Sequence, residues 1–141
     1  MYLMKIDLHT HTYYSDGKLS PAELVMRAHN QQVDVLAITD HDTVQGIAEA
    51  REYQASQKRP LHIISGVELS TKWHGFEIHI LGLHIDCQNA TLASRLAEQS
   101  ETRLTRAQKM CNKLAKIGIE GVLDEAMQRV GTGQITRAHL A

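Results

Sequence analysis

The residues most suited to chemistry stand near the start of the chain, in "DLHTH" at residues 7–11 and "SDG" at 15–17. In an extended strand alternate side chains share a face, so positions 7, 9 and 11 project together. Imidazole and carboxylate groups are ligands for Zn, Mn and Fe. A single His-x-His pair is a weak signal, because such pairs are also common as structural or surface residues.

Other polar residues follow the apolar runs further along the chain. His41 comes after the run at 35–38, Glu68 after 61–67, and His79 lies within 76–83. In parallel sheets and α/β barrels, functional groups collect where strands end. The predicted metal ligands are His9, His11, Asp16, His41, Glu68 and His79.

Six nitrogen and oxygen ligands are too many for one tetrahedral ion, and the absence of nearby thiolates argues against a structural zinc site. We expect two or three ions, with Glu68 as a bridge and an open position for water. Such clusters generate hydroxide near neutral pH and hold the oxygens of a phosphoryl group. The predicted reaction is phosphate-ester hydrolysis by metal-bound hydroxide, with no side chain assigned as the base.

Neighbouring acidic residues have other expected roles. Asp7 shares the ligand face, and both orientation of a histidine and direct metal contact remain open for it. Asp40 and Asp42 are expected to form hydrogen bonds within a turn or helix cap. The histidines not predicted as ligands are His29, His62, His74 and His84.

Alternating apolar runs and helical patterns must position these groups, and they predict a parallel α/β fold. Strands are expected at 5–8, 35–38, 61–67 and 76–83, with a turn at 73–75. Helices are expected at 21–32, 44–56, 92–117 and 122–130, and from about 136. Four strands cannot close a barrel, so we expect a C-terminally truncated piece rather than a complete open sheet.

Arginines in the helical part are candidates for binding substrate phosphate. Arg103 and Arg106 are three residues apart and share a helix face, where most arginines are simply solvated. Arg137 and His139 follow a glycine loop at the start of a helix, a place that favours anions. The predicted substrate-binding set is therefore Arg103, Arg106, Arg137 and His139.

Composition limits the classes of partner. The 141 residues carry 15 basic and 16 acidic side chains, which argues against a large nucleic-acid patch or membrane surface. We therefore expect neither membrane association nor binding to duplex DNA. Cys87 and Cys111 are isolated, and no signal peptide is apparent, so we expect a cytoplasmic location.

The segments "DLHTHTYYSDG", "AITDHDT", "GVELS" and "EIHILGLHID" together resemble the PHP superfamily of polymerase and histidinol phosphatase metal-dependent phosphoesterases. Within it, "GVELSTKWHGFEIHILGLHID" and "ITRAHLA" are similar to the bacterial 3',5'-nucleoside bisphosphate phosphatases. Some members of that branch also act as 5'-to-3' exoribonucleases on short RNA. The resemblance implies a small phosphorylated nucleotide or a short 5'-phosphorylated RNA as substrate.

The resemblance also implies a distorted, TIM-like (β/α)7 barrel interrupted by a helical insertion. Residues 1–86 would form the N-terminal half of the barrel, and residues 87–141 would begin the substrate-binding insertion. Three divalent ions are implied, manganese foremost, with zinc, iron or magnesium as alternatives. By resemblance the three ions would be held by His9, His11 and Glu68; by Glu68 and His79; and by Asp16 and His41.

The resemblance places Arg137 and His139 near a second phosphate of the nucleotide. Family members take further ligands, a histidine and a later Asp-x-His pair, from the second half of the barrel, and neither motif occurs in these 141 residues. Two alternatives remain open. One is a non-catalytic metal-binding module of a larger assembly, such as a polymerase, and the other is amidohydrolase chemistry on a similar barrel.

Overall fold

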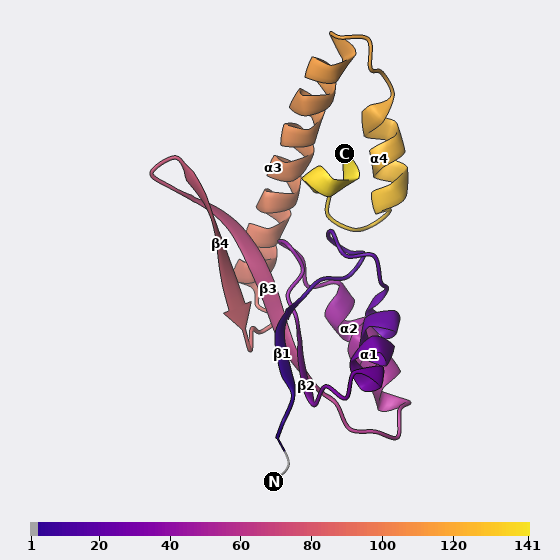
Figure 1. Ribbon diagram of the computed structural model, residues 1–141. Coiled ribbons are helices and arrows are strands. Elements are labelled where there is room, and N and C mark those ends of the chain that lie inside the picture. The colour runs from indigo at the N-terminus through magenta and orange to yellow at the C-terminus, as the bar shows by residue number, and fades with distance from the viewer. Residues whose placement is uncertain (1–2) are drawn as a thin grey trace.

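A four-stranded sheet in the order β1-β2-β3-β4 forms the centre of the computed structural model, which describes residues 3–141 (Figure 1). The strands are β1 (Ile6–Thr10), β2 (Val35–Ile38), β3 (His62–Trp73) and β4 (Phe76–Leu83). β1, β2 and β3 are parallel, and β4 pairs with β3 in the antiparallel sense. The structure is therefore an open, curled α/β sheet.

Two helices, α1 (Pro21–Asn30) and α2 (Gly46–Ala55), cover one face of the parallel strands (Figure 1). A capping box fixes the start of α1, because Ser20 Oγ accepts from Glu23 N while Glu23 Oε2 accepts from Ser20 N. The core between helices and sheet contains Leu24, Val25, Ala28, Val33, Leu36, Ile38, Ile47, Ala50, Leu61 and Ile63. This packing leaves the strand ends free to carry polar residues.

A helical part follows the sheet. Helix α3 (Ala90–Ala115) begins at Asn89, whose side chain accepts a hydrogen bond from Leu92 N at 3.0 Å. It packs against α4 (Val122–Val130) and the short 3₁₀ helix η1 (Arg137–His139) beside it (Figure 1). A small core of Ala107, Ala126, Val130 and Ile135 joins these elements.

The expected element types are confirmed, but three details differ. The turn at 73–75 is a tight hairpin with positive φ at His74 (47°) and Gly75 (83°), so β4 runs antiparallel. β3 continues past Glu68 to Trp73 because it pairs with β4 along that length. The helix expected from about 136 is a single 3₁₀ turn.

Within residues 3–141, no helix is both long and apolar enough to cross a membrane. The sheet is open among these residues, with β1 and β4 at its edges.

Candidate metal centre

Glu68 lies at the centre of the predicted ligand set. Its Oε2 atom is 2.8 Å from His9 Nε2 and 3.2 Å from His11 Nε2. Its Oε1 atom is 2.8 Å from Nδ1 of His79 on the neighbouring strand. Only 7% of Glu68 is exposed, so this carboxylate is surrounded by imidazoles rather than by water.

A second set of contacts joins the first strand-to-helix loop to the end of β2. Asp16 Oδ2 is 3.3 Å from His41 Nε2, and Asp16 Oδ1 is 3.5 Å from His11 Nδ1. The rings of His11 and His41 are stacked with centroids 4.7 Å apart. His11 and His41 therefore lie between Asp16 and Glu68, and His11 contacts both carboxylates.

Three overlapping groups offer ligand atoms within 4.8 Å of one another: His9, His11 and Glu68; His11, Asp16 and His41; and His41, Glu68 and His79. The structure thus brings all six predicted side chains together. Compared with the arrangement implied by the resemblance, His11 joins the Asp16 group and His41 joins the His79 group. His29, His62, His74 and His84 belong to none of the groups found among residues 3–141.

Backbone pairing holds His41 beside Glu68. Beyond the end of β2, the two residues form a parallel bridge. Glu68 N donates to Asp40 O and Asp42 N donates to Glu68 O, each at 3.0 Å. Two candidate ligands therefore lie side by side because the sheet pairing continues past the regular strand.

The charges of the cluster stabilise one another. The pKa of Asp16 falls to about 2, chiefly because of its hydrogen bond with His41, which outweighs burial. The same hydrogen bond raises the pKa of His41, and burial acts against it. Burial lowers the pKa of His11, whereas nearby carboxylates oppose that change.

Glu68 also remains ionised despite its surroundings. Burial acts to raise the pKa of Glu68, but hydrogen bonds with His9 and His79 outweigh it, and the net pKa lies below the ordinary value. The Glu68 carboxylate is therefore in the deprotonated form that a divalent metal requires of a carboxylate ligand.

One atom in particular fits a metal ion. Nδ1 of His41 is buried and has no hydrogen-bond partner among the described residues. Glu68 Oε2 is 3.8 Å away, which is too far for a hydrogen bond. Buried polar atoms are normally satisfied, so this nitrogen indicates a partner other than a protein group. The donor set and this free nitrogen together suit a divalent ion.

A cavity of about 220 Å³ adjoins the cluster and brings the predicted arginines to it. Its lining includes Asp16, His41 and His79 from the cluster and Arg103, Arg106 and Arg137 from the helical part. Arg106 and Arg137 both approach Glu77 of β4, at 3.4 and 4.0 Å. The three predicted arginines therefore line the same cavity as three of the predicted metal ligands.

His139 lies differently from the arginines. Its Nδ1 accepts a hydrogen bond from Thr136 N at 3.0 Å and lies 2.9 Å from Thr136 Oγ1. It is not among the residues that line this cavity. In this structure His139 closes a local turn, and any contact with substrate stays a prediction.

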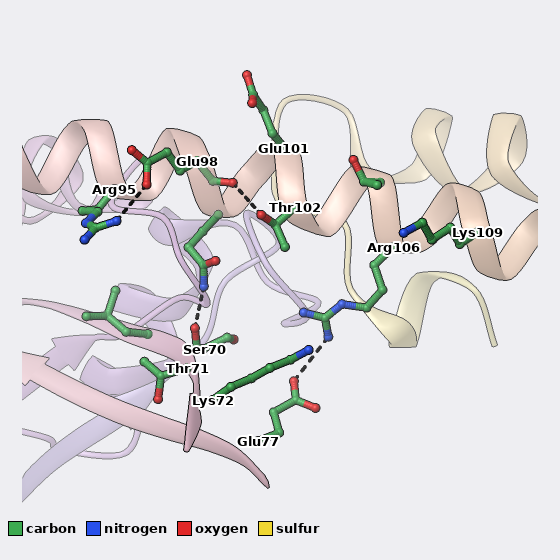
Figure 2. Close-up of a pocket in the computed structure, with 13 residues that line it drawn as sticks. Ser70, Thr71, Lys72, Glu77, Arg95, Glu98, Glu101, Thr102, Arg106 and Lys109 are labelled. Atoms are coloured by element: carbon green, nitrogen blue, oxygen red, sulfur yellow. Dashed lines mark hydrogen bonds and ion pairs between the residues drawn. The ribbon is translucent and has the colours of Figure 1, made fainter. Parts of the chain in front are cut away.

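A larger cavity of about 1000 Å³ lies between the β3-β4 hairpin and α3. Figure 2 shows Arg106 pointing from α3 toward Glu77, and Arg95 pairing with Glu98 along the helix. Arg106 and Glu77 also line the smaller cavity, so the two spaces meet at this pair.

The acidic residues beside His41 do not have the local roles expected of them. Asp40 accepts hydrogen bonds of 2.6 Å from Thr12 N, Thr12 Oγ1 and Ser15 Oγ, which hold the loop after β1. Asp7 Oδ1 accepts from the backbone N of His9 at 3.3 Å, and no contact of Asp7 with an imidazole ring is found within residues 3–141. Asp40 therefore joins two strand ends rather than capping a helix.

Asp42, for which the sequence predicts a hydrogen bond within a turn or helix cap, has distant partners instead. It is 0% exposed, and its Oδ1 accepts from Ser70 N at 2.9 Å. Its Oδ2 accepts from Arg103 Nε at 2.7 Å. The only signal in the sequence is an acidic residue next to a histidine at a strand end, and that pattern does not identify the distant partner.

Comparison with known proteins agrees with this geometry. The PHP domain family model matches residues 7–118. The chain is 46% identical over 140 residues to the 5'-3' exoribonuclease Rnm of Escherichia coli (strain K12), covering 99% of this chain and 48% of that protein. It is 40% identical over 140 residues to the 3',5'-nucleoside bisphosphate phosphatase of Chromobacterium violaceum, with 99% and 48% covered. The chain thus spans about half the length of these relatives.

Solved structures show the same fold. An amidohydrolase from Chromobacterium violaceum with bound sulfate superposes with a TM-score of 0.87 at 40% identity, covering 96% of this chain and 48% of that one. A Bifidobacterium adolescentis protein assigned to the metal-dependent phosphoesterases gives a TM-score of 0.87 at 29% identity, with 97% and 48% covered. From the motif match, the shared fold and the clustered ligands, we conclude that the chain belongs to the PHP domain family.

Proposed function

We propose that this protein is a metal-dependent phosphoesterase that hydrolyses phosphate monoesters of small nucleotides, in the manner of a 3',5'-nucleoside bisphosphate phosphatase. One observation carries the proposal. Three overlapping groups of metal-ligand atoms adjoin a cavity that is also lined by three arginines. Metal ions held by these ligands would act on the phosphate group that is hydrolysed. The guanidinium groups beside them would hold the negatively charged substrate by charge-assisted hydrogen bonds.

The candidate ligands divide among three divalent ions, for which manganese is our first choice. A neutral imidazole offers one lone pair, so each histidine would serve one ion. His9, His11 and Glu68 would hold one ion, Asp16 and His41 a second, and Glu68 and His79 a third. Divalent ions in such a centre activate water and stabilise the charge that develops on phosphoryl oxygens. Glu68 is the residue best placed to serve more than one ion, because its two oxygens face different histidines.

Residues 87–141 would then contribute to substrate binding. Arg106 and Arg137 line the cavity, and within residues 3–141 the acidic partner of each is Glu77. When a phosphate group binds in the cavity, the arginines would leave their exposed ion pairs with Glu77, which contribute little to stability. They would form stronger, charge-assisted hydrogen bonds to the phosphate instead. The sulfate in the Chromobacterium violaceum structure, an anion with phosphate-like shape and charge, is consistent with an anion site in this family.

A second candidate function is 5'-3' exoribonuclease activity on short RNA at the same site. The larger cavity favours it, because this space meets the smaller one at Arg106 and Glu77 and offers room for a longer substrate. The similarity to an Escherichia coli enzyme named for this activity also supports it.

The test is release of phosphate from adenosine 3',5'-bisphosphate with Mn²⁺, using this chain and the longest form that its gene encodes. We expect manganese-dependent release by the long form, and its loss in His9→Ala. The matched control is His62→Ala, since His62 lies outside the ligand groups. Bound manganese without release from either nucleotide or 5'-phosphorylated RNA would contradict the proposal and favour a non-catalytic module.

A further inference from the structure

We propose that Arg103 of α3 is a positioning residue that fixes the His41–Glu68 pair of the candidate metal centre through Asp42 and Ser70. The inference rests on the proposed function, because it concerns the same centre. It assigns α3 a direct part in forming that centre, and it gives Arg103 a role other than binding substrate phosphate.

Arg103 has little capacity left for a phosphate. Its Nε donates to Asp42 Oδ2 at 2.7 Å, and its Nη2 lies 2.7 Å from both Asp42 Oδ2 and Ser70 Oγ. Its Nη1 donates to Ile135 O at 3.3 Å. Each nitrogen of the guanidinium therefore has an acceptor in the protein, and only 12% of the side chain is exposed. Arg106 and Arg137, by contrast, each lie near one acidic partner in the described part of the chain, Glu77 at the rim.

Asp42 depends on this arginine. Its side chain is fully buried, and a buried carboxylate requires a charge partner and hydrogen bonds. Its backbone also has a φ of 51°, in the left-handed region that non-glycine residues seldom adopt. Arg103 and Ser70 N together supply the contacts that hold the residue in this conformation.

The effect reaches the metal ligands through the backbone. Asp42 directly follows His41, and Asp42 N donates to the carbonyl of Glu68 at 3.0 Å. Ser70, the other partner of Arg103, is paired with His79 in the β3-β4 hairpin. The two partners of the Arg103 guanidinium are therefore close to three candidate ligands. Asp42 is next to His41 in the sequence, and Ser70 is two residues after Glu68 and opposite His79 in the hairpin.

A second contact from α3 strengthens this attachment. The side-chain amide of Gln99 donates to the carbonyl of Ser70, one helical turn before Arg103. Arg103 and Gln99 thus fasten α3 to the same residue of β3, at the boundary between the two cavities. Because an imidazole ligand must be held in orientation by its surroundings, loosening this attachment should weaken metal binding.

The experiment measures Mn²⁺ affinity by calorimetry on the longest form that the gene encodes, without phosphate or nucleotide. The variants are Arg103→Lys, Arg103→Met and the pair Arg103→Met with Asp42→Asn. In the double variant no buried charge is left unpaired, and asparagine tolerates a positive φ, so the chain should keep its fold. Arg95→Met is the matched control, because Arg95 lies on the same helix and pairs only with exposed Glu98.

We expect about tenfold weaker Mn²⁺ binding in the Arg103 variants, including the folded double variant, and an unchanged affinity in Arg95→Met. Folded variants that bind Mn²⁺ as tightly as the wild type would overturn the inference and leave the proposed function standing. Unchanged Mn²⁺ affinity with weakened binding of inorganic phosphate would also overturn it, because Arg103 would then be a substrate ligand. A wild-type chain and full-length form that bind no Mn²⁺ would overturn the proposed function itself.

Discussion

The surroundings of Glu68 and of Asp42 differ in a way that separates a metal site from a structural ion pair. Both carboxylates are buried, and Asp42 N donates to the backbone carbonyl of Glu68. Glu68 faces the rings of His9, His11 and His79, at 2.8 to 3.2 Å. Asp42 faces a guanidinium and a backbone amide.

The difference lies in whether the groups around each carboxylate can lose a proton and become metal ligands. An imidazole nitrogen loses its proton near neutral pH and then offers a lone pair to a metal, so the groups around Glu68 are themselves ligands. A guanidinium and a peptide N–H keep their protons and offer no lone pair. A cation can therefore join the Glu68 cluster, whereas around Asp42 it would meet a positive charge.

The largest expected effect is on the Asp42 side. Asp42→Ala leaves Arg103 buried without its charge partner, and the free energy of unfolding should fall by about 3–5 kcal/mol. Urea unfolding followed by circular dichroism measures this. Glu52→Ala, at an exposed position on α2, should stay within about 0.5 kcal/mol of the wild type. A loss below about 1 kcal/mol in Asp42→Ala would mean that the pair is not a structural one.

The next effect separates the two carboxylates by metal affinity. Among residues 3–141, Glu68 is the one carboxylate that belongs to two ligand groups. Loss of a residue that only supports a ligand weakens metal binding by up to about 100-fold, so Glu68→Gln should weaken Mn²⁺ binding by at least that factor. Calorimetric titration measures the affinity, with exposed Glu98→Gln as the control. Stability in EDTA should change little. Retained affinity in Glu68→Gln would remove the distinction between the two carboxylates.

The smallest effect tests the contact between the two regions. Ser70→Ala deletes the hydroxyl that accepts from Arg103 while leaving the backbone amide that donates to Asp42. We expect a loss of about 1 kcal/mol in unfolding free energy. Ser56→Ala, which removes an exposed hydroxyl at the end of α2, is the control and should cost less. An equal loss of unfolding free energy in the two variants would show that the hydrogen bond from Arg103 to the Ser70 hydroxyl does not stabilise the fold.

The sequence predicted much of the fold because the relevant signals are local. The capping box at Ser20 and Glu23 fixed the start of a helix, and apolar runs located the strands. The strand sense of β4 was missed, because alternation with helices favoured parallel pairing while the decisive feature was the two-residue turn at His74 and Gly75. Residues 73–75 were recognised as a turn, but not as one that folds β4 back onto β3.

The candidate site was predictable where local sequence signals mark its residues, and not where its contacts join distant parts of the chain. His9, His41 and Glu68 follow apolar runs, and strand ends that share an edge bring their side chains together. The partnership of Asp42 and Arg103 spans 61 residues and obeys no periodicity, so only the folded chain reveals it. Arg103 therefore looked like another candidate for phosphate binding, although its nitrogens are taken by Asp42, Ser70 and Ile135.

The order of residues along the chain has a consequence for how the site is assembled during synthesis. Every candidate ligand in this chain precedes residue 80, whereas Arg103 lies well inside α3. At about 5–20 residues per second, the ribosome releases the ligands seconds before it releases the arginine. The histidines of the proposed metal centre are thus made before the arginine that we propose to fix their positions.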